Sequence, residues 1–342
     1  MIAGYYTKLD CMKRITLLLV LQAIVCTIVA QQNTKPVLIP SRFIDGARFY
    51  IQILSVNNDT LLGFADTGGG FTAIYPGTVD RLQLAGQVQT IQSEIGELGA
   101  LPFTDVVKDD RIPKIEIPFF LTLKESSFMV PPKQIMESEI REIVKAIPHD
   151  IFLGQYFFIG KAWTFDYRKQ EVWVNTPVLK TNANAANVQL LGFKKDKDGK
   201  KLYGHPSMKV VIDGDTLDVL FDTGASFLLS AAGRTNLNTT QLSMGGSFIA
   251  RSVFDRWRQK HPDWKVFEKS DGQADIIEVP EIKIGSYTAG PVLFSVRPDE
   301  AWSKGMISSM DKVVLGAVGG SALKYFTVKA DYNQELIEFI KR

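Results

Sequence analysis

Short apolar runs, separated by clusters of Gly, Asn and Asp, follow one another along most of this chain. Residues 208–212 and 216–221 are two such runs, and the Asp-Gly-Asp sequence between them is typical of the turn of a β-hairpin. Two stretches, residues 138–147 and 250–260, have helical spacing instead. The pattern therefore predicts an all-β protein, mostly strands with a few short helices.

A weak internal repeat relates the two halves of the chain. In each half an apolar run, residues 61–65 or 217–221, leads directly into an Asp-Thr-Gly triplet, and the triplets are 156 residues apart. One such triplet is a common turn sequence, but two after matching apolar runs favour a duplication. The six residues of the triplets are Asp66, Thr67, Gly68, Asp222, Thr223 and Gly224.

Two later landmarks keep the same order in both halves. An acid, a short apolar run and a glycine occur at residues 150–154 and again at 311–316. Each half then closes with the pattern of a hairpin, residues 163–174 and 327–339. Three features repeated in order predict two lobes related by a pseudo-twofold axis, with a cleft between them.

A polar stretch of small residues, 180–187, has no periodicity and marks the boundary between the lobes. We therefore expect an N-terminal lobe of residues 31–183 and a C-terminal lobe of residues 184–342.

The first 30 residues differ from the rest. A short basic stretch, residues 12–14, precedes 16 almost unbroken apolar residues that end at Ala30. This layout is typical of a secretory signal peptide, and 16 residues fall short of the ~20 that a membrane-spanning helix needs. We expect residues 1–30 to be a signal peptide cleaved after Ala30, and the protein to be exported (secreted, periplasmic or on the cell surface). A retained N-terminal anchor is the alternative.

Removal of this segment leaves a neutral chain. It takes away three of the 39 basic residues and one of the 37 acidic residues, so that 36 of each remain. Such a chain has no excess charge with which to bind nucleic acid or an anionic membrane. Both cysteines, Cys11 and Cys26, are also removed, so we expect neither disulfides nor thiol chemistry.

An Asp-Thr-Gly turn after a buried strand suits acid–base chemistry. Glycine lets the backbone bend and brings N–H groups close to the carboxylate. If two such turns meet at a pseudo-twofold axis, the carboxyl groups share one proton, because they cannot both be ionised at hydrogen-bonding distance. One acid then acts as a general base toward a water molecule and the other as a general acid toward the substrate.

These landmarks resemble the duplicated signature of the aspartic peptidases, both pepsin-like and retropepsin-like. The resemblance spans nearly the whole chain after residue 30, as sparse motifs. It implies the bilobal pepsin-like acid protease fold, with Asp66 and Asp222 as the catalytic residues. It also implies that Gly154 and Gly316 close a loop beneath each acid. The residues that would support the two acids, including an interlocking pair of threonines, are Thr67, Gly68, Thr223 and Gly224.

The implied activity is that of an aspartic endopeptidase, which hydrolyses a peptide or protein substrate bound in an extended conformation. A monomer suffices because both halves supply an acid, and the reaction needs no cofactor and no metal. The alternative is a protein of another class: a catalytically weak or inactive binding protein or inhibitor on the same scaffold.

Two departures from the pepsin-like pattern bear on that alternative. Pepsin-like enzymes carry a tyrosine in a flap hairpin about forty residues after the first acid; this chain has none there, and Phe103 is the residue available to cover the cleft. The positions after the triplets are Gly69 and Ala225, where pepsin-like members have Ser or Thr. Without a hydroxyl to stabilise the ionised form, the carboxyl pKa values rise, so we expect a working range nearer neutral pH than that of pepsin.

Other chemistries lack a matching pattern. His149, His205 and His261 are scattered without the spacing of metal ligands, and we expect them to be surface or loop residues. The run of glycines 68–70 is not followed by the Lys-Ser/Thr of a phosphate loop, and a Gly-x-Ser-x-Gly elbow is absent.

Overall fold

The computed structural model describes residues 35–341, except residues 94–95, 136–139 and 183. The chain from Val37 onward forms one compact unit. The predicted signal peptide, residues 1–30, lies outside the described residues, so its cleavage and the export of the protein stay predictions. Within the described ranges, no helix is both long enough and apolar enough to cross a membrane.

An eight-stranded sheet forms the first lobe. Its strand order is β2-β3-β4-β9-β5-β8-β7-β6, and most neighbours are antiparallel. The exceptions include β4 and β9, which run parallel at the centre of the sheet. The strands are β2 (Ser41–Ile44), β3 (Arg48–Leu54), β4 (Thr60–Ala65), β5 (Ala73–Ile74), β6 (Gln89–Ser93), β7 (Gly96–Pro102), β8 (Ser127–Val130) and β9 (Ile151–Leu153).

A nine-stranded sheet forms the second lobe, in the order β18-β19-β22-β17-β23-β14-β13-β20-β21. The predicted hairpin at residues 208–221 is confirmed as β13 and β14, and its turn residues Asp213 and Gly214 both have positive φ. A separate two-stranded sheet pairs β15 (Ser226–Leu228) with β16 (Ser243–Gly245). The strands of the large sheet are β13 (Ser207–Ile212), β14 (Asp215–Phe221), β17 (Ser247–Ala250), β18 (Val266–Asp271), β19 (Ala274–Val279), β20 (Ile282–Ile284), β21 (Tyr287–Ala289), β22 (Val292–Arg297) and β23 (Gly316–Val318).

A six-stranded sheet joins the lobes, in the order β1-β11-β10-β24-β25-β12. The hairpin patterns at residues 163–174 and 327–339 are confirmed as β10–β11 and β24–β25, and the two hairpins pair with each other through β10 and β24. The strands are β1 (Val37–Ile39), β10 (Ala162–Asp166), β11 (Glu171–Val174), β12 (Val188–Leu190), β24 (Thr327–Asp331) and β25 (Leu336–Ile340).

The helices are short. The helical pattern at residues 250–260 is confirmed as α8, which buries Val253, Phe254 and Trp257 on its apolar face. Within the predicted stretch 138–147, the helix α5 covers Arg141–Ala146. The α-helices are α2 (Pro76–Arg81), α3 (Phe103–Val106), α4 (Lys133–Ile135), α5 (Arg141–Ala146), α6 (Gln155–Phe158), α7 (Ala231–Asn236), α8 (Arg251–Lys260) and α9 (Gly320–Leu323).

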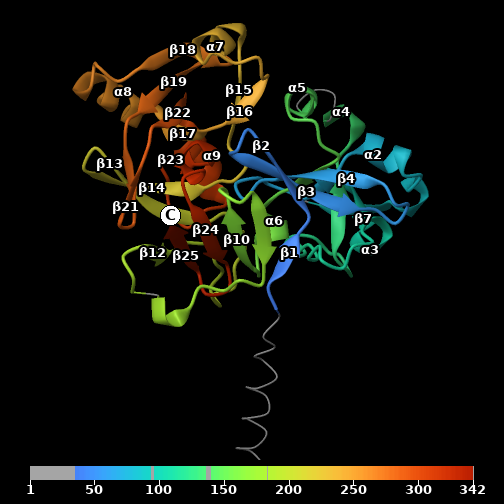
Figure 1. The fold of residues 1–342 in the computed structure, drawn as a ribbon. Helices are drawn as coiled ribbons and strands as arrows, with labels where there is room; N and C mark the ends of the chain where they lie inside the picture. The colour runs from blue at the N-terminus through green and yellow to red at the C-terminus, as the bar shows by residue number, and fades with distance from the viewer. Residues whose placement is uncertain (1–34, 94–95, 136–139, 183, 342) are drawn as a thin grey trace, which may run out of the picture. The chain divides into compact units, whose positions relative to one another are not determined.

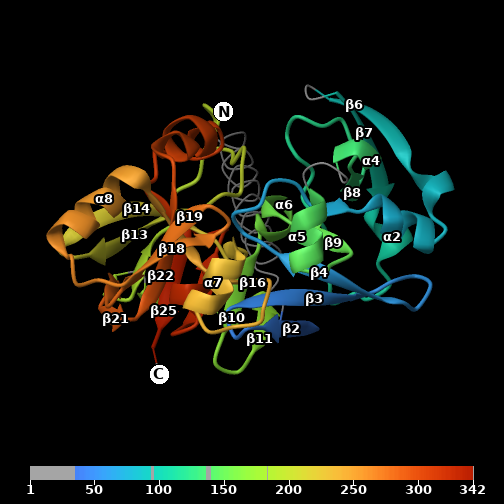
Figure 2. The same cartoon turned by 90° about the horizontal axis from the view of Figure 1, so that it is seen from above.

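The two lobes lie on either side of the shared sheet. Figure 1 shows the blue-to-teal strands β2–β4 and β7 at the right and the orange strands β17–β19 and β22 at the upper left, with β10, β24 and β25 lower in the view. Figure 2, from above, again shows β3 and β4 on one side and β18, β19 and β22 on the other. One apolar core includes residues of both lobes, for example Phe165 and Phe221, whose ring centroids are 6.1 Å apart. The predicted mostly-β, two-lobed fold is confirmed, while the boundary after residue 183 stays a prediction.

Candidate active site

The two predicted acids leave equivalent strands in the two lobes. Asp66 directly follows β4, whose end runs parallel to β9, and its backbone N–H donates to the carbonyl of Leu153 at 3.0 Å. Asp222 directly follows β14, which runs parallel to β23, and its N–H donates to the carbonyl of Val318 at 3.0 Å. Each acid is therefore fixed to its own sheet by the same hydrogen bond.

This equivalence corrects the predicted role of Gly316. The residue after Leu153 is Gly154, so its counterpart after Val318 is Gly319. Gly316 instead begins β23 and pairs with Ile249 of β17. Gly154 and Gly319 are 165 residues apart, the same interval that separates the first residues of β10 and β24. The Leu-Gly pair at residues 315–316 resembles the one at residues 153–154 in sequence only. The strand β9 ends at Leu153, whereas β23 begins at Gly316.

The threonines of the triplets interlock. The Thr67 hydroxyl accepts the backbone N–H of Thr223 at 3.0 Å and donates to the carbonyl of Phe221 at 2.9 Å. The Thr223 hydroxyl accepts the N–H of Thr67 at 3.2 Å and donates to the carbonyl of Ala65 at 3.0 Å. Both threonines are fully buried. Four hydrogen bonds thus connect the two lobes directly beside the acids.

The glycines of the triplets allow the acids to approach each other. The N–H groups of Gly68 and Gly224 each donate to Oδ1 of the aspartate of their own triplet, at 3.0 Å. A Cβ atom at Gly224 would lie 2.2 Å from Cγ of Asp66, and one at Gly68 would lie 2.6 Å from Cγ of Asp222. Each carboxyl group therefore packs against the opposite glycine, in space that any side chain would occupy.

The carboxyl groups of Asp66 and Asp222 interact with each other by a hydrogen bond. Asp222 is only 7% exposed, and Asp66 is partly buried. Burial raises the pKa of Asp66 well above its ordinary value, and the negative charge of Asp222 raises it further. Burial also raises the pKa of Asp222, against the lowering effect of its hydrogen bonds. The pair consequently retains one shared proton at a pH where isolated aspartates have lost theirs.

The positions after the triplets are closely packed. A Cβ at Gly69 would lie 2.5 Å from the ring of Phe152, and the Cβ of Ala225 faces Gly319. Phe103 does not cover a cleft: it is 6% exposed and stacks on Phe128 in the core of the first lobe, with ring centroids 5.6 Å apart. That prediction was wrong, because the helix α3 directs the ring inward.

All three histidines lie in loops, as expected, but two of them are not at the surface. His149 and His205 are buried, with 7% and 5% exposure, whereas His261 is partly exposed and stacks on Trp264. His205 hydrogen-bonds to the carbonyl of Gly69, next to the first triplet. Sequence patterns carried no signal for this contact, since it joins loops that are 136 residues apart. Across the described parts of the chain, no three His, Cys, Asp or Glu side chains are grouped as a metal site.

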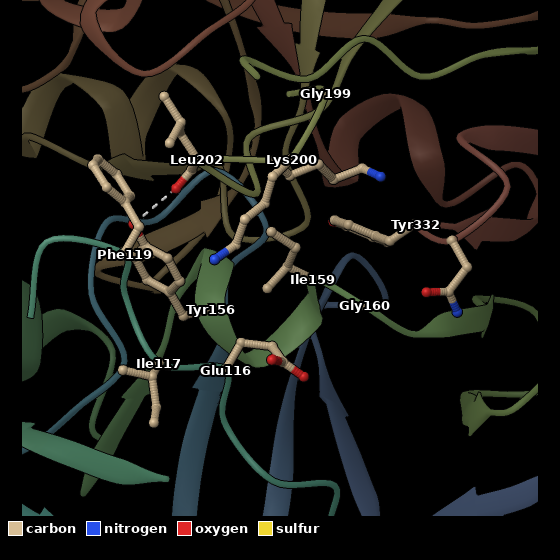
Figure 3. A pocket seen from close by; sticks show the side chains of 12 residues that line it. Glu116, Ile117, Phe119, Tyr156, Ile159, Gly160, Gly199, Lys200, Leu202 and Tyr332 are labelled. Carbon is tan, nitrogen blue, oxygen red and sulfur yellow. Dashed lines mark hydrogen bonds between the residues drawn. The ribbon is translucent and has the colours of Figure 1, made fainter. Parts of the chain in front are cut away.

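Figure 3 shows a pocket of about 360 Å³. Its lining includes Glu116, Phe119, Tyr156 and Lys200 but neither acid. The hydroxyl of Tyr156 donates to the carbonyl of Leu202 at its edge. We assign this pocket no part in the chemistry of the acids.

No protein-family model and no curated protein sequence matches the chain. Two solved structures are similar to it at a distance. A retropepsin-like aspartic protease from Rickettsia conorii has 14% identity and a TM-score of 0.26, over 44% of this chain and 90% of the other. Conglutin gamma, a basic 7S globulin from lupine seeds, has 9% identity and a TM-score of 0.42, over 90% of this chain and 95% of the other. Similarities as distant as these do not identify the function of the site, which is interpreted from its own geometry.

Proposed function

We propose that this protein is an aspartic endopeptidase that hydrolyses peptide bonds with a water molecule activated between Asp66 and Asp222. The observation that carries the proposal is the interlocked pair of triplets. It brings together two carboxyl groups from different lobes, Asp222 buried and Asp66 partly buried, in hydrogen-bonding contact and with raised pKa values. A structural turn has no need of two acids brought together in this way, because their mutual desolvation and repulsion destabilise the fold.

The shared proton divides the work between the acids. The ionised carboxylate takes a proton from the attacking water, while the protonated carboxyl donates to the carbonyl oxygen of the scissile bond. The amide groups of Gly68 and Gly224 hold the carboxylates in place, so that little reorganisation is needed as charge moves. The roles then exchange as the leaving amine is protonated, and no covalent intermediate forms.

The substrate we propose is a peptide or protein segment in an extended conformation, which presents its carbonyl to the pair. A single chain provides both acids, so a monomer is the proposed active form. Export of the protein, by cleavage or by a retained anchor, belongs to the same proposal and rests on the sequence of residues 1–30.

The test is cleavage of an unfolded protein across pH 3 to 8, with and without pepstatin. We expect pepstatin-sensitive cleavage by the wild-type chain and its loss, by at least a factor of about 10³, in Asp66→Asn and in Asp222→Asn. Asp110→Asn is the matched control, because Asp110 is exposed on a loop of the first lobe, and it should cleave like the wild type.

The opposing outcome is a folded wild-type chain that cleaves nothing across this range. It would favour the other class of function, a binding protein or inhibitor that retains the triplets without turnover.

A further inference from the structure

One side chain in each lobe lies opposite the acid of that lobe and reaches across to the other lobe. In the first lobe the last residue pair of the β3–β4 ladder is Tyr50 with Phe64, and Arg48 and Asp66 each lie two residues beyond it. In the second lobe the last pair of the β13–β14 ladder is Ser207 with Leu220. His205 and Asp222 each lie two residues beyond that pair. Arg48 and His205 therefore occupy equivalent positions.

Arg48 crosses from the first lobe to the second. It is 2% exposed, and its Nη1 donates to the hydroxyls of Ser226 and Ser243 at 3.0 and 3.2 Å. Its charge is neutralised within its own lobe by Asp45, which accepts from Nη2 at 2.6 Å. Ser226 in turn donates to the carbonyl of Gly224 in the second triplet. The crossing contact is therefore made by a charged side chain whose ion pair lies in its own lobe, and it is linked through Ser226 to the turn of Asp222.

His205 crosses in the opposite direction without an ion pair. Its Nε2 lies 3.0 Å from the carbonyl oxygen of Gly69, and its Nδ1 lies 2.8 Å from the hydroxyl of Ser309. A carbonyl only accepts, so Nε2 carries a proton. In the neutral ring Nδ1 is an acceptor for the Ser309 hydroxyl, which also lies within donating distance, 3.2 Å, of the carbonyl of Met306. Burial lowers the pKa of His205 to about 4, which keeps the ring neutral in this tautomer above that pH.

The carbonyl of Gly69 is held from two sides. It accepts the N–H of Gln155 at 3.0 Å as well as the Nε2–H of His205. The loop of His205 is itself tied to the same helix, because Gln155 Oε1 accepts the N–H of Gly204 at 2.7 Å. In the same turn the N–H of Gly68 donates to the carboxylate of Asp66 at 3.0 Å, and the N–H of Gly69 donates to the backbone carbonyl of Asp66 at 3.1 Å. Movement of the carbonyl consequently moves the donors of Asp66.

We propose that His205 is a positioning residue for Asp66, which acts by holding the Gly69 carbonyl and with it the turn that carries the Asp66 amide donors. The kinetic part of this inference rests on the proposed peptidase function, whereas the contact itself does not. The closing experiment therefore uses one measurement that needs no turnover.

The matched variants are His205→Gln and His205→Asn. A glutamine amide nitrogen reaches the position of Nε2 and retains the bond to Gly69, whereas an asparagine amide reaches only the position of Nδ1 and retains the contact with Ser309. Ser309→Ala removes the other partner of the ring. All three are made in the full chain, and the carboxyl carbons of Asp66 and Asp222 are titrated by NMR alongside measurements of kcat and KM.

We expect His205→Asn to shift the titration of the pair upward, since weaker amide bonds stabilise the ionised form less. We expect its kcat to fall by roughly tenfold to a hundredfold with little change in KM. His205→Gln and Ser309→Ala should stay near the wild type in both measurements.

The inference is overturned if His205→Asn titrates like the wild type, or if His205→Gln is impaired to the same extent. If His205→Asn does not fold, the test rests on His205→Gln. The inference then requires this variant to have the carboxyl titration and kcat of the wild type, although it has lost the ring and the Ser309 bond. A wild-type chain without turnover removes the proposed peptidase function, and the NMR titration still decides the role of His205.

Discussion

Thr67 and Thr223 each use one hydroxyl to accept an N–H from the other triplet and to donate to a carbonyl of the opposite strand. The arrangement is reciprocal, so neither lobe can shift without breaking bonds on both sides. Since both side chains are buried, water does not replace a lost partner. The threonine hydrogen bonds thus both stabilise the fold and hold the two acids in position.

We therefore predict that Thr67→Val destabilises the fold. Valine has nearly the same shape but leaves the N–H of Thr223 and the carbonyl of Phe221 unpaired in the interior, at a cost of about 3 kcal/mol. Urea unfolding measures the loss. Thr67→Ser keeps the hydroxyl and should cost less than about 1 kcal/mol; equal midpoints for the two variants would contradict this account.

The approach of each acid to the opposite glycine gives a second prediction. In Gly224→Ala the new methyl group would lie 2.2 Å from Cγ of Asp66, so the Asp66 carboxyl group must leave its position beside the second triplet. We expect turnover to fall by about a hundredfold or more. In Gly77→Ala, in α2, the methyl group meets nothing within 4 Å, and turnover should be unchanged.

Comparison of the two glycine variants distinguishes displacement of the carboxyl group from a general loss of stability. Circular dichroism and thermal unfolding show whether Gly224→Ala is folded. A folded Gly224→Ala enzyme with wild-type turnover would mean that catalysis does not require the Asp66 carboxyl group to pack against Gly224.

The sequence predicted the parts of this site that local patterns encode. The triplets, the strands before them and the two closing hairpins all depend on neighbouring residues, and the structure contains them. The prediction from sequence failed for residues whose place in the site depends on packing between distant segments. Gly316 and Gly319 both follow apolar residues, so the sequence does not decide which of them corresponds to Gly154. His205 lies in a loop, and its buried contacts are with Ser309 and with Gly69 of the other lobe. Only the strand registers reveal that these residues are equivalent to Gly154 and Arg48.

The raised pKa values of the acids predict the pH dependence of turnover. The working form of the pair holds one proton, and activity is lost at high pH when that proton leaves. Burial raises the pKa of both acids, so the alkaline limb of the pH–rate profile should lie above the ordinary range of aspartic acid. A profile with its optimum in strong acid and an alkaline limb near pH 4 would contradict this prediction.

A hydroxyl next to the second triplet should move the alkaline limb of the pH–rate profile to lower pH. The N–H of Ala225 already bonds Asp222, and in Ala225→Ser the added hydroxyl stabilises the ionised carboxylate, so the alkaline limb should shift to lower pH. Ala85→Ser, on the exposed surface of the first lobe, serves as the control. An unshifted limb in a folded Ala225→Ser enzyme would show that the hydroxyl has no access to Asp222.

The buried ring of His205 also makes the stability of the fold depend on pH. Its pKa falls from 6.5 in the unfolded chain to about 4 in the folded chain, because burial disfavours the charged form. Between these values the unfolded chain takes up a proton that the folded chain does not. The free energy of unfolding should therefore decrease as the pH falls, by up to about 3 kcal/mol from this residue. The raised pKa of Asp66 acts in the opposite sense, since it favours the folded state at low pH.

The His205 contribution is isolated by comparison with His205→Gln, in which the carboxyl pair and the buried His149 remain and cancel. Urea unfolding of both proteins at pH 7, 6, 5 and 4 gives the difference in stability at each pH. We expect the free energy of unfolding of the glutamine variant to rise relative to that of the wild type from pH 7 to pH 4. The variant lacks the imidazole that becomes protonated in the unfolded wild-type chain over this range. Parallel stability curves would mean that the ring exchanges protons equally in both states, and thus that it is not held neutral against Gly69.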